Sequence, residues 1–494
     1  MLATLLSACL YLVFIRRKYA HLPSPVMSSF FQGHYLDALR ISKEQTGSDT
    51  GPPSRAFLQW SREVGNLYVV FFAWLPIVVT LNPQDVKVLM TSPACPKPIY
   101  IFKQFRRLLG ERLLGNSLFS IREYTEWRPR RKLYDQAFNK TYLQCLAPQF
   151  NACVNKLVDE LKLLADGKTL VSFKKYMHQV TMDVISQVAF ATDFKEEWKK
   201  RALDLKYTKG NGLHFLIQHT FKGFHKVLFN PIFQYLHPFE AESYRETTRV
   251  LRAMGRDCIL KTMKAVRSSD RIAPNILTCI LQMAETEHNA DTETLVDDFV
   301  LFYIAGQETS AVAALFALVL VHQHADVLEK LLQEIDHVLG KKDTISFEDL
   351  DKLCYTEQVI KESMRMYPPF TVSRRLVQEG GLVLSGYQIP AGTEVNMSGD
   401  AMCHMQEYVD NPDIFDPSRF DSKETILSSF VYLPFGAGHR SCIGKLFAMI
   451  EMKIILARLL QVFAITLPQN YKLEIQLGMT QQPRDDVECT ILCR

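Results

Sequence analysis

One long helical pattern restricts the possible folds of this chain more than any other feature of the sequence. From Thr292 to His322, apolar residues recur at three- and four-residue spacing for about thirty residues, which is much longer than the average globular helix. A helix of this length is expected to cross the middle of the fold. The pattern therefore predicts a helical core arranged around Thr292–His322.

Other patterns predict further helices and a few short strands. Two strands are expected within Tyr68–Leu81, and a hairpin or small sheet is expected between Gly381 and Asn396, from Leu382-Val383-Leu384 to Thr393-Glu394-Val395. Ser346-Phe347-Glu348-Asp349 is typical of a capped helix start. Helical spacing is found in Tyr142–Ala165, Val171–Phe190, Glu240–Val266, Ala325–Leu339 (ending at Gly340) and Lys445–Val462. The predicted fold class is mainly α with small β-sheets.

Composition excludes several functional classes. The chain has 494 residues, of which 47% are hydrophobic and 22% charged, as in a globular protein with a large core. A net charge of +4, without any nucleic-acid-binding signature, argues against a DNA- or RNA-binding protein. The 11 cysteines include no C-x-x-C pair, so a disulfide scaffold, a zinc site and a redox dithiol are not expected.

The amino-terminal residues have the pattern of an uncleaved membrane anchor. Met1–Ile15 is almost wholly apolar and is followed by Arg16, Arg17 and Lys18, which the positive-inside rule places in the cytosol. The apolar run is shorter than the ~20 residues of a full span, so it either spans incompletely or is extended by interfacial residues. We expect an anchor with its basic flank at 1–18, a proline-containing connector at 19–33 and the main folded body at 34–494.

A cysteine near the carboxyl terminus lies in a setting that favours its thiolate form. Cys442 belongs to the segment Phe435–Gly444, just before the predicted helix Lys445–Val462. Glycines ahead of it permit left-handed backbone, so amide N–H groups can turn toward the sulfur, and the helix start adds a positive dipole end. A thiolate is the axial ligand that a ferric haem accepts, and Gly444 allows a macrocycle to approach closely.

This segment resembles the cytochrome P-450 signature F-x-x-G-x-R-x-C-x-G at every specified position. Glu362 and Arg365 resemble the E-x-x-R helix of that superfamily, and Arg419 resembles its later P-x-R-F segment. The resemblance extends over nearly the whole chain. It implies a cytochrome P-450 fold whose long central helix crosses the haem, a catalytic domain at 34–494, haem b as cofactor and Cys442 as the ligand of its iron. It also implies that the Glu362–Arg365–Arg419 group is a buried network that shapes the cysteine loop.

Ala305-Gly306-Gln307-Glu308-Thr309, within the long helix, resembles the oxygen-activation motif of the family, A/G-G-x-[DE]-T. The resemblance implies that Ala305 and Gly306 leave room for O2 and that Glu308 and Thr309 are catalytic residues that deliver protons. Thr309 can also bond to a helix carbonyl and open the helix locally. Because family members that only rearrange peroxides often lack this pair, its presence favours monooxygenation.

Further cofactor contacts are implied by the same resemblance. Trp127 and Arg131 match the W-x-x-x-R of the family, which binds a haem propionate, and Arg440 and Arg375 are expected at a propionate as well. Phe435 opens the cysteine signature and is expected to contact the cofactor. The same helix carries three more basic residues, Arg128, Arg130 and Lys132. By family analogy they form the docking face for an acidic flavoprotein reductase. The alternative is a basic face that is simply solvated.

The substrate class is suggested by a narrower likeness. Gly110–Gly115, Phe302–Ala311 and Gly438–Gly444 are most similar to the cholesterol 24-hydroxylase family, which implies hydroxylation of a sterol side chain; Gln307 departs from that family, which has histidine there. The positions expected to contact substrate are mostly apolar, as suits a lipid: Tyr100, Phe102, Phe105, Ala305, Phe370, Val372 and Met479.

Three other functions stay open at this point: a monooxygenase of fatty acids or xenobiotics, a haem-binding protein without turnover, and a peroxide-rearranging isomerase or synthase. The expected partners are an NADPH-dependent flavoprotein reductase, O2, a lipid or sterol substrate and a membrane. The expected location is the endoplasmic reticulum membrane, with the catalytic domain facing the cytosol.

Overall fold

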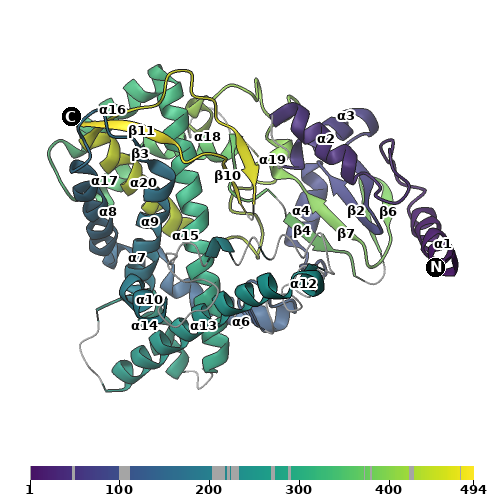
Figure 1. The fold of residues 1–494 in the computed structure, drawn as a ribbon, viewed down its shortest axis with the longest axis horizontal. Coiled ribbons are helices and arrows are strands. Elements are labelled where there is room, and N and C mark those ends of the chain that lie inside the picture. The colour runs from purple at the N-terminus through teal and green to yellow at the C-terminus, as the bar shows by residue number, and fades with distance from the viewer. Residues whose placement is uncertain are drawn as a thin grey trace. The chain divides into compact units, whose positions relative to one another are not determined.

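The computed structural model describes residues 2–46, 51–98, 112–202, 217–219, 223, 233–268, 273–286, 291–371, 373–378, 381–421, 428–478 and 480–494 (Figure 1). The chain forms two compact units. The first contains Met1–Pro98, Glu362–Cys442 and Leu473–Leu477, and the second contains Ile99–Lys361, Ile443–Lys472 and Gly478–Arg494. Each unit is described by itself.

A four-stranded sheet is the centre of the first unit. Its order is β1-β2-β7-β4, with β1 (Leu67–Phe72) antiparallel to β2 (Leu75–Thr80), β2 parallel to β7 (Glu394–Met397) and β7 antiparallel to β4 (Ser373–Leu376). The two strands predicted within Tyr68–Leu81 are confirmed. The other elements of this unit are α1 (Leu2–Lys18), α2 (Tyr35–Thr46), α3 (Ser54–Val64), α4 (Pro83–Thr91), β5 (Leu382–Leu384), β6 (Tyr387–Ile389), α19 (Gly399–Met402), the 3-10 turn Pro417–Phe420 and β9 (Ile475–Leu477).

The hairpin predicted after Gly381 has a different partner in the structure. β5 pairs with β6, so that Leu382 lies opposite Ile389, whereas β7 joins the four-stranded sheet. The prediction that paired 382–384 with 393–395 was wrong because it missed the two-residue turn Ser385-Gly386. Both residues have positive φ, 46° and 83°, which is the geometry of a tight hairpin turn.

The second unit is mainly helical. Its helices are α6 (Tyr124–Ala137), α7 (Lys140–Cys145), α8 (Ala147–Lys162), α9 (Phe173–Val184), the π-helical turn η1 (Ile185–Ala189), α10 (Phe194–Ala202), α12 (Phe233–Leu236), α13 (Pro238–Arg267), α14 (Ile276–Thr286), α15 (Thr292–Gln323), α16 (Ala325–Leu339), α17 (Phe347–Lys352), α18 (Cys354–Met366, whose residues from Glu362 belong to the first unit) and α20 (Lys445–Val462). Strands β3 (Val171–Ser172), β11 (Glu488–Cys493) and β8 (Phe463–Thr466) form a sheet in that order, and β10 is Gln481–Pro483.

Helix α15 is the core helix that the sequence predicted. Asp291 caps it by accepting hydrogen bonds from the backbone N–H groups of Glu293 and Thr294, and the helix continues for 32 residues. α9, α13 and α20 pack against it (Figure 1). Among the described residues it is the one helix long and apolar enough to cross a membrane, but 83% of its apolar window is buried inside the protein. Its apolar character is therefore explained by packing in the core.

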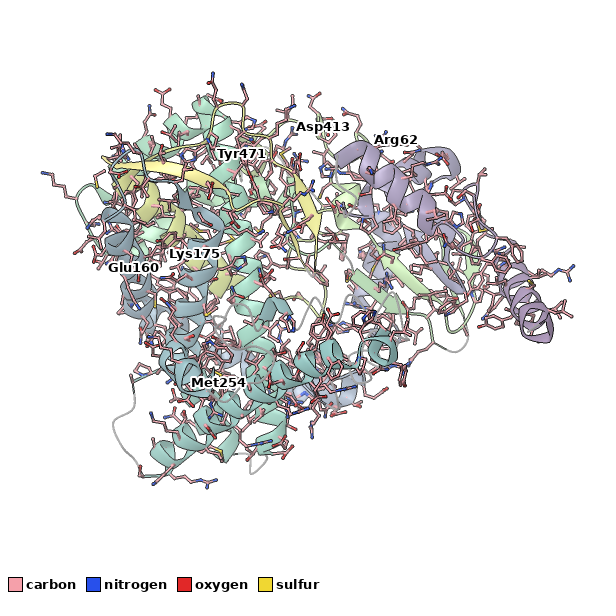
Figure 2. All side chains as sticks on the ribbon, viewed as in Figure 1. Arg62, Glu160, Lys175, Met254, Asp413 and Tyr471 are labelled. Atoms are coloured by element: carbon pink, nitrogen blue, oxygen red, sulfur yellow. The ribbon has the colours of Figure 1, made fainter. Side chains whose placement is uncertain are left out.

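Several boundaries coincide with local signals in the sequence. α16 ends before Gly340, and α20 covers Lys445–Val462, as predicted. Ser346 and Asp349 form the expected capping box at the start of α17. Among the side chains of the second unit, Met254 of α13 is buried and Lys175 of α9 is exposed (Figure 2). The mainly α fold class with small sheets is confirmed.

Helix α1 has apolar side chains on its exposed surface. Leu6, Leu10 and Phe14 are 62%, 62% and 66% exposed. At its carboxyl end Arg16 donates a hydrogen bond to the carbonyl oxygen of Phe30, and Tyr19 just beyond belongs to the hydrophobic core of the first unit. The role of α1 as a membrane anchor stays a prediction.

Candidate active site

The loop before Cys442 is closed by its own backbone. The N–H of Cys442 donates to the carbonyl oxygen of Phe435 at 2.8 Å, and Gly436 and Gly438 have φ of 67° and 66°. At Gly438 a Cβ atom would lie 2.2 Å from the carbonyl oxygen of Met90, so a side chain is excluded by space as well as by conformation. The left-handed glycines predicted for this loop are confirmed.

Cys442 differs from the buried cysteines of the chain in its exposure. Burial raises the pKa of Cys153 and of Cys489 to about 12, which keeps both as thiols at neutral pH. Cys442 is exposed at the surface of the first unit. Among these cysteines it is therefore the one whose sulfur is accessible to a ligand.

Basic side chains lie near Cys442 within the first unit. Burial, and then the charges of Arg375 and Arg440, lower the pKa of Lys97 well below its usual value, while a Cys442 thiolate acts in the opposite direction. The pKa of His439 is lowered by burial and then by Arg440 and Arg375. The structure thus brings the predicted residues Arg375, Arg440 and Cys442 together.

Arg375 has a buried guanidinium whose hydrogen bonds within the described residues go to uncharged groups. It is 4% exposed, its Nη1 donates to the carbonyl oxygen of Arg374 at 3.0 Å, and its Nη2 contacts Sδ of Met90 at 3.4 Å. Burial lowers its pKa to about 10, and it forms no ion pair with any carboxylate of the described residues. A buried guanidinium without a carboxylate partner is costly unless an anion binds there.

The donor set around Cys442 fits a haem. A thiolate at Cys442 supplies a ligand for iron, and the cations beside it match the two propionate carboxylates of the macrocycle. Lys97 and His439 were not predicted for this cluster. His439 lies inside the cysteine signature, but Lys97 comes from Pro96-Lys97-Pro98, far away in the sequence, where no local pattern marks it.

Glu362, Arg365 and Arg419 form the buried ionic network that the resemblance implied, and its role in shaping the cysteine loop stays a prediction. Glu362 and Arg365 are fully buried and form two parallel hydrogen bonds of 2.7 and 2.9 Å. Arg365 also donates to the carbonyl oxygens of Cys403 and Ile414, at 2.9 and 3.2 Å. Arg419 lies 3.4 Å from Glu362 through Nε, and it donates hydrogen bonds to the carbonyl oxygens of Asp410 and Asn411.

Trp127 and Arg131 share one face of α6 in the second unit. Trp127 is buried, and the guanidinium carbon of Arg131 lies 5.9 Å from the centre of its ring. Nε of Arg131 donates to Asp135 at 2.6 Å, so Asp135 competes for any anion that Arg131 binds. The basic face of α6 is also not uniformly solvated, because Arg130 binds the buried Asp298 of α15. The propionate role of Trp127 and Arg131 stays a prediction.

The residues of the oxygen-activation motif lie on two sides of α15, one more accessible and one buried. Oγ1 of Thr309 donates to the carbonyl oxygen of Ala305 at 2.8 Å, the helix contact expected for this threonine, and both residues lie on the more accessible side. At Gly306 a Cβ atom would lie 2.8 Å from Cδ1 of Ile185 in the π-helical turn. Gly306 therefore allows close helix packing, and the space for O2 expected beside it stays a prediction.

Glu308 lies on the buried side of α15, and its pKa is raised toward neutral pH. It is 5% exposed, and burial raises its pKa to about 7, against the smaller opposing effects of Thr480 and Lys174. Oγ1 of Thr480 donates to Oε1 of Glu308 at 3.2 Å, and Nδ1 of His178 lies 3.7 Å from Oε2. A carboxyl group with this pKa suits proton transfer at neutral pH.

Most of the predicted substrate contacts are outside the described part of the chain. Tyr100, Phe102, Phe105, Val372 and Met479 lie outside the described residues. Ala305 is exposed on α15 and Phe370 is 45% exposed in the first unit.

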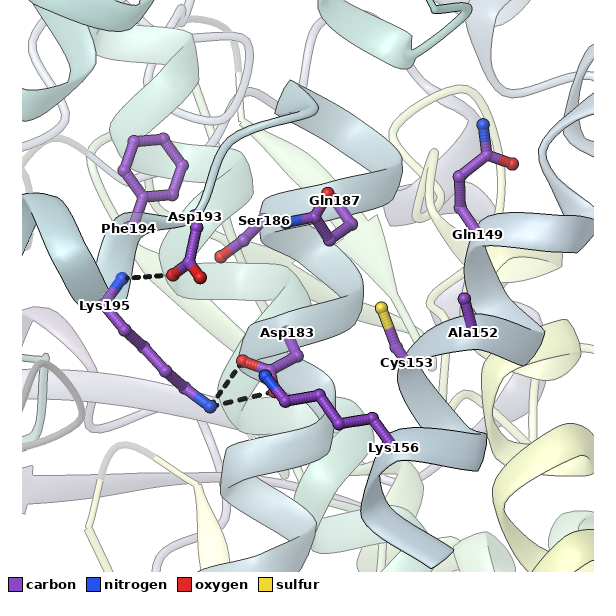
Figure 3. A pocket seen from close by; sticks show the side chains of 10 residues that line it. All are labelled: Gln149, Ala152, Cys153, Lys156, Asp183, Ser186, Gln187, Asp193, Phe194 and Lys195. Carbon is purple, nitrogen blue, oxygen red and sulfur yellow. Dashed lines mark hydrogen bonds and ion pairs between the residues drawn. The ribbon is translucent and has the colours of Figure 1, made fainter. Parts of the chain in front are cut away.

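A cavity of about 230 Å³ lies between α8, α9 and the residues that lead into α10 (Figure 3). Asp183 lies among its charged lining residues, 2.7 Å from Nζ of Lys195 and 3.7 Å from Nζ of Lys156. Of the predicted site residues within the described ranges, none lines this cavity. Its charged wall does not suit an apolar substrate.

The sequence matches a family model and is similar to known proteins. The sequence model of the family described as Cytochrome P450 matches residues 41–487. Cytochrome P450 4d2 of Drosophila melanogaster is 27% identical over 420 residues, 82% of each chain, and cytochrome P450 3A13 of Mus musculus is 28% identical over 86% of this chain and 83% of its own. Cytokinin hydroxylase of Arabidopsis thaliana is 26% identical over 87% of this chain and 82% of its own.

A solved structure shows the same fold. The haem domain of cytochrome P450DA aligns with a TM-score of 0.80 and 22% identity, over 96% of this chain and 97% of that one. The family model covers most of the chain, including the cysteine loop, the Glu362–Arg365 network and the Glu308–Thr309 pair. This protein therefore belongs to the cytochrome P450 family of monooxygenases, which carry haem with a cysteine thiolate ligand.

Proposed function

We propose that the protein hydroxylates an apolar lipid and that Cys442 is the ligand of its haem iron. The observation that carries the assignment is the group of cations around the exposed Cys442 sulfur, with the buried Arg375 bound to no carboxylate of the described residues. When bound, haem supplies the activation of O2 by which one oxygen atom enters the substrate. Arg375, Arg440, Lys97 and His439 would hold its propionates, with Trp127 and Arg131 as additional candidates.

Glu308 and Thr309 are the proposed catalytic pair for proton delivery. Glu308 can hold and release a proton near neutral pH, since its pKa is raised to about 7 by burial. Thr309 has a hydroxyl group on the accessible side of α15, bonded to the carbonyl oxygen of Ala305. This hydroxyl can accept and donate a hydrogen bond, so it can pass a proton or hold a water molecule.

Thr309→Ala is expected to keep haem and to uncouple oxygen use from product formation. The proton-relay hydroxyl is lost, and general acid catalysis of this kind is worth ~10²–10⁴-fold, so product per NADPH should fall by about tenfold or more. Product, NADPH consumption and hydrogen peroxide are measured together. Thr309→Ser, which keeps a hydroxyl, is the matched control and should retain most of the coupling; full coupling in Thr309→Ala would remove Thr309 from the proton route.

The proposed substrate is a sterol that is hydroxylated on its side chain. The proposal is supported by the likeness of Gly110–Gly115, Phe302–Ala311 and Gly438–Gly444 to the cholesterol 24-hydroxylase family. The reduced system, with NADPH and a flavoprotein reductase, is incubated with a panel of sterols and fatty acids, and products are identified by mass spectrometry. Hydroxylated fatty acids without any hydroxysterol would reject the sterol and support the fatty-acid alternative. Turnover that needs no reductase would indicate a peroxide-rearranging enzyme instead.

The proposed location is the cytosolic side of the endoplasmic reticulum membrane, where a flavoprotein reductase supplies electrons. The exposed apolar side chains of α1, followed by Arg16, Arg17 and Lys18, support an amino-terminal anchor. The full-length chain should sediment with membranes.

A further inference from the structure

Gln307 and His178 form a buried contact between α15 and α9 in the second unit. These two helices run side by side (Figure 1). Nε2 of Gln307 lies 2.9 Å from Nδ1 of His178 and 3.4 Å from the carbonyl oxygen of the same residue. On the same face, Oγ1 of Thr181 donates to the carbonyl oxygen of Gln307 at 2.9 Å. Gln307 is fully buried and His178 is 2% exposed, so the contact is isolated from solvent.

The orientation of the Gln307 amide assigns the hydrogen on the His178 ring. The carbonyl oxygen of His178 can only accept, so the atom of Gln307 that faces it is the amide nitrogen, which donates. With the amide in this orientation the same nitrogen also points to Nδ1, which then accepts a hydrogen bond and carries no hydrogen. His178 is then the neutral imidazole with its hydrogen on Nε2.

This neutral ring lies directly beside Glu308. Nδ1 of His178 is 3.7 Å from Oε2 of Glu308, and Oε2 accepts no hydrogen bond from the described residues. The other oxygen of the carboxyl group, Oε1, is bound by Thr480. The charge state of His178 therefore acts on Glu308 across a short distance in a buried setting, where charges interact strongly.

In the part of the chain that the structure describes, few other charged groups lie near Glu308. Lys174 of α9 lowers its pKa slightly, but Lys174 is itself close to Asp485 and Asp486 and donates to the carbonyl oxygen of Pro483. η1 and β10 contain no ionisable side chain, and Glu451 of α20 lies next to Ser310. Two arginines of α13 reach α15, Arg252 and Arg256, and they bind Glu293 and Asp297. Helix α16 follows the carboxyl end of α15, about 20 Å along the helix axis from Glu308.

We propose that Gln307 is a positioning residue for proton delivery: by donating to Nδ1 it holds His178 neutral, and this keeps Glu308 in the protonated form that the reaction needs. The inference rests on the proposed role of Glu308 as proton donor. Without the Gln307 amide, Nδ1 could take up a proton and form an ion pair with Glu308. An opposite charge within about 4–6 Å lowers the pKa of a carboxyl group by ~1–3 units, so Glu308 would be ionised at neutral pH.

The first test is an infrared titration of the resting holoenzyme. The protonated carboxyl band that disappears in Glu308→Gln is assigned to Glu308 and followed against pH. The wild-type midpoint is expected at about 7. In Gln307→Leu the midpoint should fall by about one pH unit or more. Haem content and the carbon-monoxide spectrum establish that each variant is folded, and Gln307→Met serves as a second variant of the same kind.

A double variant separates the proposed electrostatic effect from a packing defect. In Gln307→Leu with His178→Phe there is no ring nitrogen to be protonated, so the midpoint should return to about the wild-type value. Thr181→Val is the matched control, because it removes a hydrogen bond of the same α9–α15 contact without changing the partner of Nδ1. Its midpoint should equal that of the wild type.

The coupling of NADPH use to product formation should change in the same variants as the infrared midpoint. Because Glu308 must be protonated, coupling falls as pH rises through its pKa, and in Gln307→Leu this fall should begin at lower pH. An unchanged infrared midpoint in Gln307→Leu, or a lowered midpoint that persists in the double variant, overturns the role of Gln307. Full coupling in Glu308→Gln would instead reject the proposed proton donor, so the two failures are distinguishable.

Discussion

Cys442→Ser protein is expected to lose both the absorption band that carbon monoxide gives with thiolate-ligated reduced haem and all product formation. Serine keeps the size of the side chain but replaces a polarisable thiolate by a hydroxyl that stays neutral at pH 7. The electron donation from sulfur that helps cleave the O–O bond is thereby removed. The basic side chains of Lys97, Arg375 and Arg440 are untouched, so part of the haem affinity should remain.

Cys354→Ser is the matched control for this prediction. Cys354 is also exposed, but it lies at the start of α18, where its Sγ contacts the carbonyl oxygen of Asp351. Its variant should keep the thiolate-type band and wild-type turnover. If Cys442→Ser retained the thiolate-type band, another side chain would have to be the ligand, and the proposed site would be wrong.

The parts of the fold that the sequence predicted well are those encoded by local signals. α15 is apolar over most of its length and is capped by Asp291, so its period and its start are both visible in the sequence. The end of α16 was also predicted from a local signal, the glycine at position 340. The hairpin of β5 and β6 was missed because its turn, Ser385-Gly386, is short and its two strands have three residues each. A pattern this short does not determine which strands pair.

The candidate site shows a similar division. Cys442, Arg440 and the glycines of the loop form one contiguous motif, and Arg375 was found by its resemblance to the family pattern. Lys97 was missed because the fold brings it to the cysteine from a separate segment, without any sequence signal. Contacts of this kind depend on tertiary packing, which local periodicity does not encode.

Gln307 was noticed in the sequence, but its structural role depends on a tertiary contact. In the sequence it is only a departure from the histidine of the cholesterol 24-hydroxylase family. In the structure it faces His178, which is 129 positions away in the chain, and the pair lies beside Glu308. The physical meaning of the residue therefore depends on a partner that the sequence did not identify.

Glu362→Gln is expected to destabilise the protein by about 3–5 kcal/mol, because removing one member of a buried ion pair leaves the other charge uncompensated. Both side chains are 0% exposed, and Glu362 also accepts a hydrogen bond of 2.9 Å from the backbone N–H of Asp416. The change should lower the thermal midpoint and cause loss of haem on heating, since the network holds the carbonyl groups of Cys403 and Ile414 through Arg365. Unfolding in urea, followed by circular dichroism and haem absorbance, measures the difference.

Asp159→Asn is the matched control, because it makes the same carboxylate-to-amide change in an exposed pair. Asp159 and Lys162 are 3.0 Å apart, with side chains 72% and 48% exposed, so the loss should be ~1 kcal/mol or less. Replacing both buried partners, in Glu362→Leu with Arg365→Met, should recover part of the stability lost in Glu362→Gln, because no charge is left buried. A cost for Glu362→Gln no larger than that for Asp159→Asn would mean that the buried pair contributes little, and the structural role assigned to it would have to be abandoned.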